Sequence, residues 1–115
     1  MEEKVRVSML CQIYGKLLTE KQYQFLYDYY NNDLSLSEIA ENEQITRQAV
    51  RDNIKKGENK LFEYEEKLGI MNRMLNQEKT IEHILSELSK INSQDSDKRV
   101  TKILENLKKE INCLV

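Results

Sequence analysis

The sequence predicts an all-α protein, a helical bundle that contains a helix-turn-helix and ends in a helical hairpin. Proline is absent and only three glycines occur in 115 residues, so little interrupts a helix. Charged residues make up 33% of the chain and aromatic residues 7%, which suits slender helices with narrow apolar stripes. Apolar residues also recur at spacings of three and four along most of the chain.

The first helix is expected over about residues 2–18. Seven apolar residues there form one stripe, with Cys11 beside it: Val5, Met9, Leu10, Ile13, Tyr14, Leu17 and Leu18.

The second helix is expected from a capping box at Thr19 and Gln22 to about Asn31. Its tyrosines are expected to pack their rings inward and keep their hydroxyl groups at the rim, although stacking on nucleic-acid bases is the alternative. They are Tyr23, Tyr27, Tyr29 and Tyr30.

A short helix, a tight turn and a longer helix follow, which is the layout of a helix-turn-helix. Asn31 to Asp33 should break the second helix. Ser35 and Glu38 form another capping box, which opens a helix over about residues 36–42. After a turn at 43–45, the fourth helix should start at its cap, Thr46.

The fourth helix can run to Leu68, where Gly69 can stop it with a left-handed residue. Ala40, Ile45 and Val50 are spaced to form a small core shared by the two helices of the motif. Gly57 costs about 1 kcal/mol inside a helix. Either another backbone comes close at this residue or the helix kinks there.

Two more striped helices are expected over about residues 70–92 and 98–114, with a polar turn at 93–97. Such a pair forms an antiparallel hairpin or pairs with a second chain as a homodimer. We therefore divide the chain into a helix-turn-helix domain at 1–69 and a hairpin at 70–115 that can dimerise. The stripes contain Met71, Met74, Leu75, Ile81, Ile84, Leu85, Leu88 and Ile91, then Val100, Ile103, Leu104, Leu107, Ile111 and Leu114.

The charge is distributed unevenly along the chain. The net charge of −2 is not that of a general nucleic-acid binder. Residues 46–60 nevertheless carry a charge of +3, while residues 19–45 carry −5. Any binding of duplex DNA must therefore depend on the start of the fourth helix.

Seven side chains in this region are candidate DNA contacts. Arginine can bond to guanine and glutamine to adenine with two hydrogen bonds each, lysine suits phosphate, and hydroxyl groups near phosphates set the register. The alternative is a basic helix face that only contacts solvent. The candidates are Arg47, Gln48 and Arg51 for bases, Lys55 and Lys56 for phosphates, and Ser37 and Thr46 for register.

Other functional classes find little support in the sequence. No apolar run is long enough to span or insert into a membrane, and no signal peptide precedes the first helix, so we expect a cytoplasmic protein. Cys11 and Cys113 should be reduced, buried hydrophobes. We expect no metal site, no cofactor and no catalytic residues, because no nucleophile with a base and no phosphate-binding glycine loop occurs.

Residues 17–68 resemble a known pattern. The LT…Q opening, SLSEIAE, the hydroxyl residue before RQAV, and the small residue and KL that follow are similar to the helix-turn-helix in the fourth conserved region of bacterial sigma factors. The match to the YlxM family of small bacterial proteins is closer still, in LLTEKQ, SLSEIAE, RQAV, DNIK and the closing KL. The tail from Ile70 onward resembles this family only in its mixture of acidic and basic residues and matches none of its motifs.

The resemblance implies a DNA-binding protein of the sigma region 4 type, with contacts at the candidate residues named above. YlxM genes lie beside those of the signal recognition particle GTPase and its receptor. A role in protein targeting is therefore implied too, either as a regulator or as an adaptor that contacts signal recognition particle protein, its RNA or its receptor. Family members commonly have Ser and Tyr where Thr46 and Arg51 stand here, and sigma-type sequences have Ala in place of Gly57.

Overall fold

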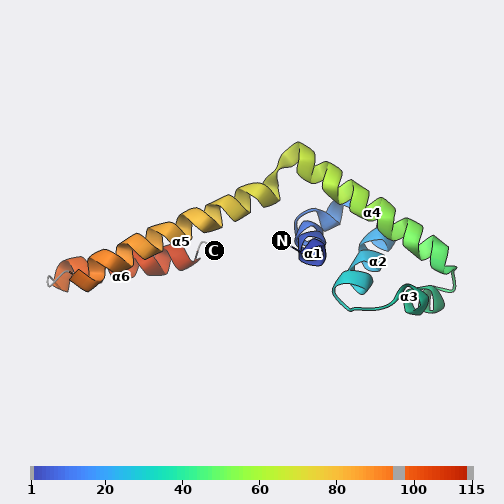
Figure 1. The fold of residues 1–115 in the computed structure, drawn as a ribbon, viewed down its shortest axis with the longest axis horizontal. Coiled ribbons are helices and arrows are strands. Elements are labelled where there is room, and N and C mark those ends of the chain that lie inside the picture. Colours follow the sequence, from blue (N-terminus) through green and yellow to red (C-terminus); the bar gives the residue numbers. More distant parts are fainter. Residues whose placement is uncertain (1, 95–97, 114–115) are drawn as a thin grey trace. The chain divides into compact units, whose positions relative to one another are not determined.

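The structure, a computed structural model, describes residues 2–94 and 98–113 (Figure 1). Six α-helices and one short 3-10 helix occur in these residues, and no strand, so the predicted all-α class is confirmed. The chain divides into two compact units, residues 1–71 and 72–115. The first unit contains α1 (Glu3–Tyr14), η1 (Gly15–Leu17), α2 (Glu20–Tyr30), α3 (Leu36–Glu43) and α4 (Arg47–Leu68).

The buried face of α1 differs from the predicted stripe. Val5 and Leu17 are 47% and 56% exposed, so their placement in the core was wrong. The 3-10 turn after α1 changes the helical register before Leu17, and α1 turns a neighbouring face toward α2 and α4. That face consists of Val7, Leu10, Cys11 and Tyr14.

The start of α2 is as predicted. The Thr19 hydroxyl accepts the Gln22 N–H at 3.1 Å, and the Gln22 side chain accepts the Thr19 N–H at 3.2 Å. Phe25 and Leu26 supply the buried face of this helix.

The tyrosines of α2 do not all pack inward. Tyr23, Tyr27 and Tyr29 are more than a third exposed, so inward packing is wrong for these three. Phe25 and Leu26 take the inward positions, and Tyr30 alone of the four is half-buried. The Tyr30 hydroxyl donates a hydrogen bond to Glu58 on α4.

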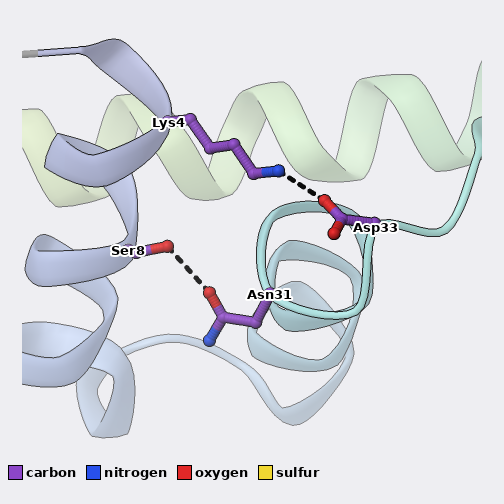
Figure 2. A network of polar contacts seen from close by, with 4 residues as sticks. All are labelled: Lys4, Ser8, Asn31 and Asp33. Atoms are coloured by element: carbon purple, nitrogen blue, oxygen red, sulfur yellow. Dashed lines mark hydrogen bonds and ion pairs between the residues drawn. The ribbon is translucent and has the colours of Figure 1, made fainter.

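Two polar contacts attach the turn after α2 to α1 (Figure 2). Lys4 pairs with Asp33, whose φ of 55° is left-handed. The Ser8 hydroxyl donates to the Asn31 side-chain oxygen at 2.7 Å. These contacts hold the segment that leads into α3.

The helix-turn-helix forms as the sequence indicates. Ser35 caps α3 in a box with Glu38, and Gln44 ends it at φ 57°. The Ile45 N–H then bonds back to the Ala40 carbonyl at 3.0 Å, which makes the turn tight. Ala40 and Val50 are buried as expected. Ile45 is 37% exposed, so its expected place in this core was wrong: its backbone closes the turn and much of its side chain faces solvent.

Gly57 lies at the contact between α2 and α4. α4 runs unbroken from Arg47 to Leu68, and Gly69 ends it with a φ of 64°. A Cβ on Gly57 would lie 2.7 Å from Cδ1 of Leu26. The close neighbour is thus a buried side chain, and neither of the expected explanations, a second backbone or a kink, accounts for the glycine.

Tyr14 joins the end of α4 to the start of α5 (Ile70–Gln94). Its hydroxyl donates to Glu65 at 2.7 Å and accepts the Ile70 N–H at 3.2 Å. Glu65 also accepts the Met71 N–H at 2.9 Å. These bonds satisfy two of the amides at the α5 N-terminus, and burial, with the Glu65 hydrogen bond second, raises the pKa of Tyr14.

The second unit contains most of α5 and all of α6 (Lys98–Cys113). α5 continues through Ser93 and Gln94, so the predicted polar turn begins later than expected, and residues 95–97 lie outside the described part. The Ile91 side chain and Leu114 of the predicted stripes also lie outside it. Cys113 is exposed, which contradicts the expectation of a buried thiol, whereas Cys11 is buried.

Candidate nucleic-acid interface

The exposed N-terminal half of α4 contains most of the candidate DNA contacts. Thr46 caps the helix by accepting the Ala49 N–H at 3.0 Å on its hydroxyl. The remaining first-turn amides of α4 leave this end of the helix suited to an anion such as phosphate. All seven candidates are exposed: Ser37, Thr46, Arg47, Gln48, Arg51, Lys55 and Lys56.

The helical repeat separates these side chains into two groups. Arg47, Arg51 and Lys55 follow one another at four-residue steps along one flank of α4, with Gln48 in the next row. Lys56 lies on the other flank, and Ser37 is on α3. The structure therefore brings Arg47, Gln48, Arg51 and Lys55 together and leaves Lys56 and Ser37 apart from them. We call these four residues the basic surface.

An acidic side chain lies within this region. The Gln48 amide donates to Oδ1 of Asp52 at 2.9 Å, one turn along α4. This bond uses one of the two N–H groups of the Gln48 amide and leaves the other, with the amide oxygen, for adenine. Asp52 also places a negative charge between the flanks where phosphates would approach.

The neighbouring helix α3 is acidic. Glu38, Glu41 and Glu43 are all exposed there, and no cation occurs within the helix. A phosphate backbone would meet attraction on α4 and repulsion on α3. The charge pattern thus favours contact along the Arg47–Arg51–Lys55 flank.

Arg6 is a cation that sequence reasoning missed. Its guanidinium lies 5.0 Å from the centre of the Phe62 ring. Phe62 is on the same flank of α4 as Lys55, at seven residues' distance, so Arg6 extends the basic surface from α1. No local pattern could reveal this, because Arg6 and Phe62 are brought together only by the packing of α1 on α4.

Residues 2–94 and 98–113 contain no cluster of three or more His, Cys, Asp or Glu residues suited to a metal ion. No helix in the same residues is long and apolar enough to cross a membrane.

Comparison with known proteins agrees with this geometry. A family model described as "Putative helix-turn-helix protein, YlxM / p13 like" matches residues 1–103. The chain belongs to this family. The resemblance to the YlxM family found in the sequence is confirmed.

Related family members match nearly end to end. A UPF0122 protein of Clostridium kluyveri is 46% identical over 93% of this chain and 100% of its own length. A UPF0122 protein of Clostridium botulinum is 44% identical over 93% and 100%. One from Fusobacterium nucleatum is 41% identical over 93% and 97%.

Proposed function

We propose that this YlxM-family protein is a non-enzymatic, cytoplasmic regulator that binds duplex DNA through the N-terminal half of α4. Arg47, Gln48 and Arg51 would contact base edges, and Lys55 would contact phosphate. Ser37, Thr46 and Lys56 would contact the backbone on either side. The observation that carries the proposal is the exposed row Arg47–Arg51–Lys55 on a capped helix that α3 braces.

Physical arguments support this assignment. The two arginines can each form two bonds to guanine in the major groove, which admits one helix. Thr46 keeps the first turn of α4 ordered, so the contacting residues start from fixed positions. The buried contacts of Ile39, Ala40 and Val50 brace the helix so that binding needs little rearrangement.

The test is fluorescence anisotropy with a pool of random-sequence DNA duplexes at low salt. The wild-type protein should bind, and the Arg47→Ala/Arg51→Ala variant should bind about 10–100-fold more weakly, because binding to a random-sequence pool depends on the attraction between cations and phosphates and the variant loses two cations. The control is Lys16→Ala/Lys21→Ala, which removes the same charge from exposed positions outside α4. Absence of binding, or equal losses in both variants, would sink the proposal.

A second candidate is an adaptor for the signal recognition particle pathway, in which the chain contacts the particle's protein, its RNA or its receptor. The acidic surface of α2 and α3 favours this candidate, because it suits a basic protein partner better than DNA. The carriers of this charge are Glu20, Asp28, Asp33, Glu38, Glu41 and Glu43.

Pull-down experiments distinguish the two candidates. The wild-type protein should recover a targeting component from lysate, and a Glu38→Gln/Glu41→Gln variant should recover less, while DNA binding stays the same or strengthens. Recovery of no targeting component by the wild-type protein would count against the adaptor.

A further inference from the structure

The described side chains of the second unit bury little apolar surface. Of the side chains described in residues 72–115, Leu104 is the one large apolar group that is almost fully buried, at 7% exposure. Units of about 40 residues rarely fold without disulfides, metals or oligomerisation. The cysteine in this unit is a free thiol, and no metal cluster occurs in its described residues.

α6 turns back and packs against α5. Only three residues separate the two helices, and Figure 1 shows α6 returning along α5. An isolated helix could not bury Leu104 to this extent, so α5 must cover it. The half-buried residues on α5 that are spaced to face α6 are Ile81, Leu85 and Leu88.

The helical repeat places the remaining apolar residues on one side of this hairpin. Leu104 on α6 and Leu85 on α5 face the other helix of the hairpin. Ile103 and Ile84 each stand one residue earlier, so each side chain is rotated by about 100° around its helix axis from that inward-facing leucine, in the same sense along the chain. In an antiparallel pair, equal rotations of this kind bring both residues to the same side. Ile84 and Leu107 also lie at similar heights, each roughly twelve residues from the turn. We call Ile84, Ile103 and Leu107 the apolar face.

This apolar face is exposed. Ile84 is 41%, Ile103 58% and Leu107 41% exposed. The side chains next to it on the same side include the uncharged Gln77, Thr80 and Asn106. The opposite side of the hairpin carries exposed charges instead: Lys79, Glu82, Lys102, Glu105 and Lys109.

We propose that the apolar face binds the same face of a second copy of this chain, so that two hairpins form a four-helix bundle. Nucleic acid does not fit, because the face lacks a cationic row. The rim of the face contains both signs, with Arg73, Glu87 and Glu110, so two identical faces do not repel each other as faces of one sign would. In a four-helix bundle, two such hairpins pack side by side, so each buries an apolar face of this kind against the other.

A second copy is favoured over another protein by the stability argument. A unit with so few buried apolar side chains needs a partner whenever it is folded, and a second copy of the same chain meets this need without any other component. This association does not rest on DNA binding, which depends on α4.

Analytical ultracentrifugation of the full chain tests the proposal. The wild-type protein should sediment as a dimer, at twice the chain mass of 13.7 kDa. Ile103→Gln/Leu107→Gln should reduce it to a monomer. The control Glu105→Gln/Lys109→Gln changes exposed residues on the opposite side of the same helix and should leave the dimer intact.

Cysteine cross-linking gives a second measurement, in which a cysteine replaces a single residue of the apolar face and no polar side chain is introduced there. In a Cys113→Ser background, Ile103→Cys should form a disulfide-linked dimer on oxidation, and Glu105→Cys should not. A wild-type monomer at all concentrations overturns the proposal. So does a dimer that survives Ile103→Gln/Leu107→Gln, or equal cross-linking at the two cysteine positions.

Discussion

Single side chains decide how strongly the α4 surface can attract DNA. Asp52 accepts a hydrogen bond from Gln48 at 2.9 Å and lies between the two flanks of cations. Its carboxylate opposes the attraction that Arg51 and Lys55 provide. The candidate contacts could be predicted from the sequence because residue type and position after a cap are local features, but the Gln48–Asp52 bond depends on side-chain conformation.

Asp52→Asn should strengthen DNA binding about three- to fivefold, which corresponds to the removal of one exposed repulsive charge worth up to about 1 kcal/mol. Anisotropy titrations at constant salt measure this change. Glu63→Gln, an equal charge change nearer the C-terminus of α4, should have a smaller effect. An affinity that falls in the Asp52 variant would mean that the carboxylate orders Gln48 for binding.

Cys11 should make the protein sensitive to alkali. Burial raises the pKa of its thiol from 9.0 to about 11. The unfolded chain therefore loses this proton first as the pH rises. The stability that the neutral thiol provides is complete below about pH 9 and is lost as the pH rises toward 11.

Urea unfolding between pH 8 and pH 11 measures this loss. The wild-type free energy of unfolding should fall by at most about 2–3 kcal/mol more than that of Cys11→Ala, which follows from a shift of two pKa units. Cys113→Ala, which changes the exposed thiol, should keep the wild-type profile. Identical profiles for wild type and Cys11→Ala would contradict this explanation.

At the scale of elements, local chemistry predicted where α2, α3 and α4 begin and where α4 ends, but not where α1 ends or which faces the helices bury. The caps at Thr19, Ser35 and Thr46 and the stop at Gly69 involve neighbouring residues only, so the sequence reveals them. The face of α1 depends on how α1 packs against α2 and α4, which periodicity could not specify when two adjacent stripes are both apolar. The same packing brings Arg6 to Phe62.

The α2–α4 contact at Gly57 yields a prediction about stability. Gly57→Ala gains about 1 kcal/mol of helix propensity but forces a methyl against Leu26, at about 1–3 kcal/mol for an overpacked core. The variant should therefore be destabilised by roughly 1 kcal/mol.

A double-mutant cycle separates the two effects. In a Leu26→Ala background the space opens, and Gly57→Ala should become stabilising. Denaturant unfolding of the four proteins measures the coupling. If Gly57→Ala changes the free energy of unfolding equally in both backgrounds, Leu26 is not the reason for the glycine.

At the scale of the whole molecule, a chain with a net charge of −2 can bind DNA as proposed only if its attraction for DNA is concentrated on one surface. In the proposed function α4 and Arg6 supply that surface, and α2 and α3 supply the opposing charge. In this proposal the affinity for DNA depends strongly on ionic strength, because each phosphate that a cation neutralises releases counterions.

The most direct test of the central claim is the salt dependence of DNA binding by wild type and Arg51→Gln. With about three to five phosphate contacts, the logarithm of the binding constant should fall with the logarithm of salt concentration at a slope of about −3 to −4.5. Because the proposed function places Arg51 on a base edge, Arg51→Gln should lower the affinity and change this slope by less than about one. A slope that becomes less steep by about one would instead place Arg51 on a phosphate. No binding at low salt, or an Arg51→Gln variant with unaltered affinity and slope, would contradict the assignment of α4 as the DNA-binding helix.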